Sequence, residues 1–263
     1  MMLAGKVALV TGASDPRSIG WGIARALAEA GADVVVNDVQ RPAELDARAA
    51  DVRQIGRRAL AVQADVTRPD AVEAMIAQTV EALGRLDIVV SNAGVIRWEH
   101  FLAITPSNLR AVIDVNVKGN VNVCRAAARQ MIRQGEGGRI ILTSSVQSDM
   151  QFPVTPVYGS TKKAMHTFVG VLALELAPHH ITVNHIGPGW VRSALNDPAP
   201  DQQTEADLHA QRRAVPLHRD GTIDEMGQAA LYFASPAAAY TTGAFLRVDG
   251  GLGISKYSDQ GEE

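Results

Sequence analysis

The chain alternates short apolar runs with longer stretches typical of helices, and this order leaves few folds open to it. Seven runs rich in β-branched residues predict strands. They lie at 7–10, 34–37, 60–63, 88–91, 139–143, 181–186 and 245–248. Continuous apolar runs are typical of a parallel sheet that is covered on both faces. The pattern therefore predicts an α/β fold, a doubly wound parallel sheet of about seven strands with helices on both faces.

Six helices are predicted between these strands, at 22–30, near 44–55, and at 70–83, 106–133, 158–177 and 224–234. No linker or repeat divides the chain, so residues 1–263 are expected to form a single domain. The exception to the alternation is 195–215, a polar segment that contains Pro198 and Pro200. Long irregular insertions are often binding loops, so we expect a substrate loop, acting as a lid, near 195–215.

Composition excludes several classes of protein. Hydrophobic residues make up 46% of the chain, enough for one core, and the net charge of −3 gives no basic surface for nucleic acid. No apolar run approaches a membrane span, and the run 7–10 is too short for a signal-peptide core. The single cysteine, Cys124, excludes an intramolecular disulfide and is expected to be buried. We therefore expect a soluble, cytoplasmic protein that takes a small-molecule substrate, with no nucleic acid, membrane or metal as partner.

A glycine-rich turn, residues 11–22, joins the first predicted strand to the first helix. Glycines in this position let backbone N–H groups approach a diphosphate at the positive end of the helix. The alternative is a tight turn that needs glycine only for its dihedral angles. The strand–turn–helix context favours the nucleotide site.

An acidic residue, Asp38, ends the second predicted strand, about 20 residues past the glycines, where it is placed to bond the ribose hydroxyls of an adenosine. It would repel a 2′-phosphate, so the sequence predicts NAD as cofactor; a solvated loop carboxylate is the alternative. Arg41 and Arg17 are the two cations expected to soften this preference without inverting it.

The pair Tyr158-x-x-x-Lys162 places a phenol and an ammonium on one face of a helix, about 5–6 Å apart at Cβ. A nearby ammonium lowers the pKa of a tyrosine, which then exchanges a proton with an alcohol or a carbonyl near neutral pH. Ser145 follows an apolar run, at the strand end where open α/β sheets bind ligands. Alone, the pair also fits a half-buried tyrosine and a solvated lysine, so the other motifs decide.

Together these residues make the chain resemble the short-chain dehydrogenase/reductase family, over essentially its whole length up to about Gly253. Any one motif is weak, but eight occur in the family's order, with 13 positions from Ser145 to Tyr158. The motifs are Thr11-Gly12…Gly20-x-Gly22, Asp65-Val66, Asn92-Ala93-Gly94, Asn116-Val117-x-Gly119, Ser145, Tyr158-x-x-x-Lys162, Pro188-Gly189 and Val248-Asp249-Gly250-Gly251.

The resemblance implies a Rossmann-type fold, a nicotinamide cofactor and hydride transfer at a carbinol or carbonyl carbon. Tyr158 would be the general acid/base, Lys162 would hold the nicotinamide ribose, Ser145 would bond the substrate oxygen and Asn116 would hold a water relay. The cofactor-binding residues would be Gly12, Ser14, Ser18, Ile19, Gly20, Asp38, Asp65, Val66, Asn92, Ala93, Gly94, Tyr158, Lys162, Pro188, Gly189, Val191 and Ser193. The helices at 106–133 and 158–177 match those of the family's main dimer contact, so a homotetramer is expected.

The chain departs from the family pattern in three places. Gly20 lies eight residues after Gly12, farther than the usual Thr-Gly-x-x-x-Gly-x-Gly allows, so we expect rearranged phosphate contacts. The longer turn is similar to that of the divergent enoyl reductases, which have a longer Tyr-to-Lys spacing than this chain. Ser91 replaces an asparagine, and Ser193 replaces a threonine but retains the hydroxyl.

The substrate is predicted from three loops that should face the cleft. Gln147 and Gln151 follow the serine, Trp98 follows the Asn-Ala-Gly turn and Trp190 follows Pro-Gly. Hydrogen-bonding side chains with aromatic walls suit a polyhydroxylated ligand, so with Ser145 they predict a sugar or polyol dehydrogenase; the alternative is that they point to water. A ketoacyl-type carbonyl reductase and a catalytically silent NAD-binding regulator are the rival functions.

Overall fold

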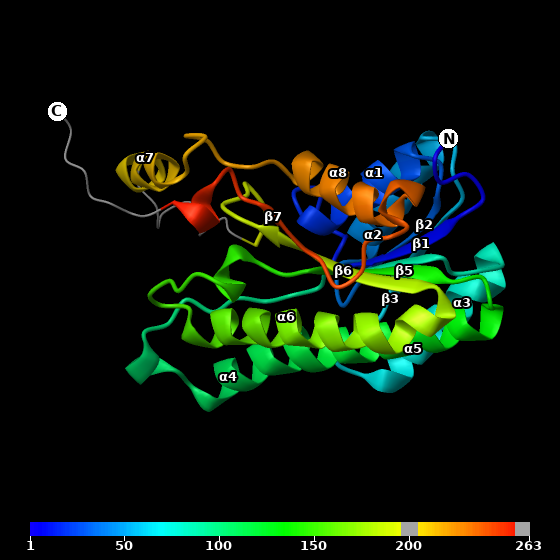
Figure 1. The fold of residues 1–263 in the computed structure, drawn as a ribbon, viewed down its shortest axis with the longest axis horizontal. Helices are drawn as coiled ribbons and strands as arrows, with labels where there is room; N and C mark the ends of the chain where they lie inside the picture. The colour runs from blue at the N-terminus through cyan, green and yellow to red at the C-terminus, as the bar shows by residue number, and fades with distance from the viewer. Residues whose placement is uncertain (196–204, 256–263) are drawn as a thin grey trace.

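A computed structural model describes residues 1–195 and 205–255 of the chain. All seven predicted strands are present, and they form one parallel sheet in the order β3-β2-β1-β4-β5-β6-β7 (Figure 1). The strands are β1 (Val7–Thr11), β2 (Asp33–Asp38), β3 (Ala59–Gln63), β4 (Ile88–Ser91), β5 (Gly138–Thr143), β6 (Ile181–Pro188) and β7 (Phe245–Val248). Strand order reverses between β1 and β4, and ligands bind at such a switch point in open α/β sheets. The predicted single-domain doubly wound fold is confirmed.

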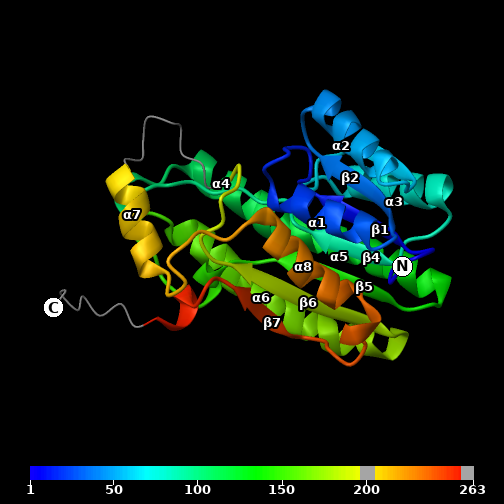
Figure 2. The same cartoon turned by 90° about the horizontal axis from the view of Figure 1, so that it is seen from above.

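Helices cover both faces of the sheet. On one face lie α1 (Ile19–Glu29), α2 (Pro42–Gln54) and α8 (Ile223–Ala234), side by side in Figure 2. On the other lie α3 (Pro69–Leu83), α5 (Asn120–Gln134) and α6 (Pro156–Leu176), with α4 (Pro106–Ile113) near the carboxyl ends of the strands (Figure 1). The cysteine of α5, Cys124, is fully buried as predicted.

The alternation of side chains along a strand explains why the apolar runs are continuous. In β1, Val7 and Leu9 join the core under α3, α5 and α6, whereas Ala8 and Val10 join the core under α1, α2 and α8. All four are fully buried, because both faces of the sheet are covered.

The long helix predicted at 106–133 is confirmed as one continuous helical run, but its middle is not α-helical. A π-helical turn, Asp114–Gly119, separates α4 from α5 and widens the helix by one residue per turn. Packing shapes this turn, since a Cβ on Gly119 would lie 2.8 Å from the side chain of Val66. Such turns are frequent at functional sites, and this one carries Asn116.

The prediction that 195–215 is irregular is wrong in part, because Glu205–Ala214 form the helix α7. Its residues are mostly good helix formers, and both prolines precede it. The remainder of the predicted substrate loop, 196–204, lies outside the described residues. In the part of the chain that the structure describes, no helix has the length and apolar content to cross a membrane.

Candidate active site

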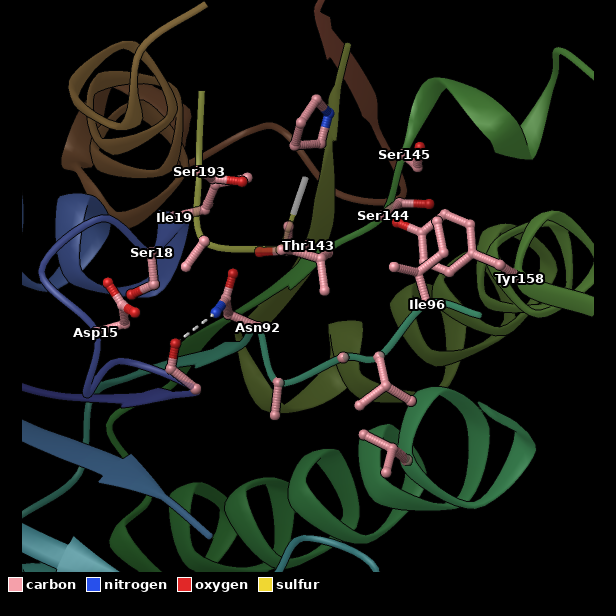
Figure 3. Close-up of a pocket in the computed structure, with 18 of the residues that line it drawn as sticks. Asp15, Ser18, Ile19, Asn92, Ile96, Thr143, Ser144, Ser145, Tyr158 and Ser193 are labelled. Carbon is pink, nitrogen blue, oxygen red and sulfur yellow. Dashed lines mark hydrogen bonds between the residues drawn. The ribbon is translucent and has the colours of Figure 1, made fainter. Parts of the chain in front are cut away.

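A pocket of about 370 Å³ lies at the carboxyl ends of the strands (Figure 3). Its walls come from the segments that follow β1, β2, β3, β4, β5 and β6, at the switch point between β1 and β4. The structure brings most of the predicted site residues together around it. They are Gly12, Ser14, Ser18, Ile19, Asp38, Asp65, Val66, Asn92, Ala93, Gly94, Trp98, Ser145, Gln147, Tyr158, Lys162, Pro188, Gly189, Trp190 and Ser193.

Three residues predicted to contact ligands do not line this pocket. Gly20 lies behind the turn, where a Cβ would come within 2.3 Å of the Gly12 carbonyl oxygen, so its role is close packing. Val191 is buried in the core beside its bridge to Gly221. Gln151 is exposed and donates a hydrogen bond to the carbonyl of Asp149 at 3.4 Å. The sequence placed all three close to the site but did not show which way they face.

The first turn ends at the start of α1. Ser18 caps this helix, accepting a hydrogen bond from the Trp21 N–H at 3.0 Å, and both Ser18 and Ile19 line the pocket. A helix start aimed at a cavity is an anion site, because its first N–H groups lack partners and carry the positive end of the dipole. The additional residues of the longer turn lie before Ser18, so they leave the start of α1 in place beside the pocket.

The adenosine end of the pocket, as the sequence predicts it, is acidic. The Asp38 carboxylate accepts hydrogen bonds from the Ser14 hydroxyl at 2.7 Å and from the Val39 N–H at 2.8 Å. Asp65 and Val66 line the same pocket. These bonds hold Asp38 in place before any ligand arrives.

The turn after β4 is fixed to the turn after β1. The Asn92 side-chain amide donates to the Thr11 carbonyl at 2.9 Å and to the Gly12 carbonyl at 3.1 Å, and the Ala93 N–H donates to the Thr11 hydroxyl at 3.0 Å. Figure 3 shows Asn92 between the two sides of the pocket. Two loops far apart in sequence therefore form one rigid floor.

The tyrosine and the lysine of the motif are both buried on α6. Burial raises the pKa of Tyr158 to about 12, although hydrogen bonding with Ser145 opposes the shift. Burial also lowers the pKa of Lys162 to about 8. The Lys162 ammonium lies 5.4 Å from the centre of the Tyr158 ring and donates to the Thr143 carbonyl at 2.8 Å. The predicted lowering of the tyrosine pKa is therefore wrong for this structure, because desolvation of the phenolate dominates.

The predicted relay residue, Asn116, is fully buried and does not line the pocket. Its amide oxygen accepts from the Val95 N–H at 2.9 Å, and its amide nitrogen donates to the Val95 carbonyl at 2.9 Å and to the Thr161 hydroxyl at 3.2 Å. The side chain thus ties the π-helical turn to the loop after β4 and to α6. Both protons of the Asn116 amide are donated to these partners, so the side chain has no proton left to donate to a water of the predicted relay.

Three hydroxyl groups in the pocket wall point to a polar ligand. The Thr143, Ser144 and Ser193 oxygens are buried and have no hydrogen-bond partner among the described residues. Buried hydroxyls without partners are costly, so a ligand with donors and acceptors fits here. The carboxamide of a nicotinamide has both. Neither Thr143 nor Ser144 was predicted from the sequence to bind a ligand, although they are the two residues before Ser145.

The pocket has an aromatic wall on the side where the sequence predicts the substrate. Phe152 and Trp190 line it and meet edge to face, with ring centres 5.7 Å apart. They pack in one apolar cluster with Val146 and Leu252. Beside them, the side-chain amide oxygen Oε1 of Gln147 accepts a hydrogen bond from the Thr155 hydroxyl at 2.8 Å, which orients the amide. Sequence analysis missed Phe152 and Leu252, since neither belongs to a polar motif.

An anion site at a helix start and a proton-transfer pair share this cavity, and that combination defines a dinucleotide-dependent oxidoreductase. Residues 12–253 match the family described as enoyl-(acyl carrier protein) reductase. A short-chain type dehydrogenase/reductase from Mycobacterium marinum is similar in structure, with a TM-score of 0.89 and 38% identity over 96% of this chain and 97% of that one. The chain therefore belongs to the short-chain dehydrogenase/reductase family, whose members use a nicotinamide cofactor.

Two further relatives act on sugars or sugar acids by name. The L-rhamnose 1-dehydrogenase (NAD(P)(+)) of a Sphingomonas species is 34% identical over 97% of this chain and 98% of that protein. A gluconate 5-dehydrogenase from Burkholderia cenocepacia, solved with NADP and tartrate, has a TM-score of 0.90 and 35% identity, covering 96% of this chain and 97% of that one. The relatives therefore include sugar dehydrogenases, one of them named for NAD(P)⁺ and the other solved with NADP.

Proposed function

We propose that the protein is an NAD(H)-dependent dehydrogenase that transfers hydride between the nicotinamide and a secondary alcohol or carbonyl, most suitably of a sugar or polyol. The observation that carries the choice of cofactor is Asp38, held by Ser14 at the adenosine end of the pocket. A carboxylate there gains hydrogen bonds from two ribose hydroxyls and repels a 2′-phosphate.

The chain's own residues would hold the cofactor along the pocket. The start of α1, with Ser18 and Ile19, would bind the diphosphate, and Asp38 would bind the adenosine ribose. The buried hydroxyls of Thr143 and Ser193 would meet the carboxamide. The nicotinamide, when bound, supplies or accepts the hydride.

Tyr158 would carry the proton. With a pKa of about 12 its phenol is protonated at neutral pH, ready to donate to a carbonyl oxygen that is being reduced. Ser145 would orient that oxygen, and the Lys162 ammonium would bind the nicotinamide ribose. Oxidation of an alcohol needs the phenolate instead, so turnover in that direction is expected to rise with pH.

The charges in the pocket support an uncharged substrate. Among the described residues that line it, the charged side chains are Asp15, Asp38, Arg41, Asp65 and Lys162. The first four belong to the turns around the predicted adenosine site, and Lys162 is buried beside the tyrosine. The substrate side instead combines hydroxyls and an amide with aromatic faces. That chemistry suits the hydroxyls and the C–H faces of a neutral sugar or polyol.

Two other functions remain as rivals. A ketoacyl-type carbonyl reductase fits the family's matched description, but such enzymes normally use the phosphorylated cofactor, which Asp38 disfavours. A catalytically silent NAD-binding regulator would need no catalytic set, yet Ser145, Tyr158 and Lys162 all meet in this pocket.

Steady-state turnover with a panel of neutral sugars, polyols, sugar acids and ketones, each with NAD⁺ or NADH and with NADP⁺ or NADPH, tests the proposal. We expect NAD-linked turnover that is highest with neutral sugars or polyols. Turnover confined to ketoacyl thioesters with NADPH would support the reductase instead. Binding of NAD⁺ without turnover on any substrate would support the regulator.

We also propose that the protein acts in the cytoplasm as a homotetramer. Apolar side chains are exposed on the helices that the family uses for its main dimer contact. They are Leu109 and Ile113 on α4, Ile132 on α5, and Val171 and Leu174 on α6. A second copy of the chain would cover these side chains. Obligate interfaces of this kind often bury more than about 2,000 Å². A monomer by light scattering at micromolar concentration would refute it.

A further inference from the structure

The lengthened glycine turn brings a second carboxylate to the adenosine end of the pocket. Asp15 directly follows Ser14, whose hydroxyl bonds Asp38, and both carboxylates line the pocket. Figure 3 shows Asp15 beside Ser18 at one end of the cavity. Asp15 was not among the residues predicted from the sequence to bind the cofactor.

This carboxylate is fixed by its neighbours. It accepts a hydrogen bond from the Arg17 N–H at 2.8 Å, lies 3.5 Å from the Arg17 guanidinium, and bonds the Arg41 guanidinium at 3.1 Å. Its side chain is only 16% exposed. Partial burial alone would raise the pKa of Asp15, but the bonds from Arg17 and Arg41 hold it below its usual value, so the group stays anionic.

Arg41 is the cation that a 2′-phosphate would meet. It follows the end of β2 by three residues and, among the described residues lining the pocket, it is the single cation on the turns around Asp38. Its backbone is left-handed, with φ of 64°, immediately before the proline that begins α2. That conformation is disfavoured for a residue with a side chain, and such outliers cluster at functional sites. In Arg41 this left-handed backbone occurs together with the ion pair between its guanidinium and Asp15.

We infer that Asp15 is a specificity residue for the cofactor, acting through Arg41. It neutralises the arginine and holds it in an ion pair. Among the described residues that line this end of the pocket, a 2′-phosphate then finds two carboxylates and no cation outside an ion pair. This inference rests on the proposed use of NAD and extends it, because Asp38 then has a partner in the inserted turn. Without Asp15, Arg41 is released to bind the phosphate.

The test is the binding of NAD⁺ and NADP⁺ by titration calorimetry with no substrate present, so that the readout does not depend on turnover. Asp15→Asn keeps the size of the side chain and removes its charge. We expect the affinity for NADP⁺ to rise about 5- to 30-fold, because Arg41 is released from its ion pair and binds the 2′-phosphate, while the affinity for NAD⁺ stays within about twofold. Asp15→Asn combined with Arg41→Gln should lose this gain.

Two further variants keep the result decisive. Glu44→Gln removes an exposed carboxylate from the first turn of α2 and should leave both affinities unchanged, which controls for net charge. Arg41→Gln alone should change NADP⁺ affinity by less than about twofold, because Asp15 already occupies the arginine. This result is informative even if Asp15→Asn does not fold.

The inference is overturned if Asp15→Asn leaves the ratio of the two affinities unchanged, if its gain survives Arg41→Gln, or if Arg41→Gln alone weakens NADP⁺ binding tenfold or more. The proposed function fails differently. Tighter binding of NADP⁺ than NAD⁺ by the unaltered protein would reject NAD dependence, whereas the role of Asp15 is judged by the change that its substitution causes.

Discussion

The acid sensitivity of the fold should depend on one buried histidine of β6. His185 is fully buried, and both of its ring nitrogens lack a hydrogen-bond partner among the described residues. Its ring contacts His166 of α6 at 4.8 Å and Phe245 of β7 at 4.7 Å between ring centres. Burial lowers the pKa of His185 to about 4, with repulsion from His166 adding to the effect and Asp149 opposing it.

The sign and size of the effect follow from linkage. An unfolded histidine titrates near pH 6.5, so between pH 6.5 and 4 the unfolded chain binds a proton that the folded chain excludes. The contribution of His185 to the free energy of unfolding is therefore fully present above pH 6.5, and it is lost as the pH falls toward 4. At about 1.36 kcal/mol per pKa unit, the whole difference is worth about 3 kcal/mol, of which about 2 kcal/mol is lost between pH 7 and pH 5.

The assay is urea unfolding at pH 7 and pH 5, at one protein concentration, for the unaltered protein and for His185→Leu. The variant removes the titrating group from an apolar setting, so its free energy of unfolding should fall by about 2 kcal/mol less over this pH interval. His179→Gln, at an exposed position, serves as the matched control and should behave like the unaltered protein. Equal losses for the unaltered protein and His185→Leu would refute the reasoning.

Three other substitutions follow from the site. In steady-state assays with both cofactors, the unaltered protein should prefer NAD by at least about tenfold in kcat/KM, and Asp38→Ala should remove most of a margin worth about 2–4 kcal/mol; preference for NADP would contradict this. Asn116→Ala should lower the free energy of unfolding by about 1–3 kcal/mol in urea, because it leaves the partly buried backbone N–H and carbonyl of Val95 without their partner; an unchanged midpoint would show that the amide does not brace the loop. Trp190→Ala should raise KM for the substrate about tenfold and leave NAD⁺ affinity unchanged by calorimetry; an unchanged KM would remove the aromatic wall from the substrate site.

The sheet was predictable because its signal is local. Each strand is a short apolar run, and burial on both faces makes that run continuous, as Val7, Ala8, Leu9 and Val10 show. The change from α-helix to π-helix between α4 and α5 has no such local signal; the close approach of Gly119 to the side chain of Val66 is a contact between residues far apart in the chain. Helix α7 was missed because its polar composition resembles a loop, although its residues favour a helix.

The site was predictable in its membership and less so in its chemistry. The order of the motifs along the chain predicted that the glycine turn, Asp38 and the Tyr158–Lys162 pair lie together, because all of them follow strands that end at the same edge of the sheet. The pKa of Tyr158 could not be predicted, since it depends on how completely the phenol is buried. The ion pair of Asp15 with Arg41 joins residues far apart in the chain, so spacing alone gives no sign of it.

The most direct test of the central claim compares the unaltered protein with Tyr158→Phe in NAD-linked turnover at saturating cofactor and the best substrate of the panel. The variant keeps the ring and removes the hydroxyl group that carries the proton to be transferred. We expect a loss in kcat of at least about 10²-fold, in a variant that still binds NAD⁺ by calorimetry and still unfolds cooperatively in urea. Near-normal turnover by a folded Tyr158→Phe protein would contradict it.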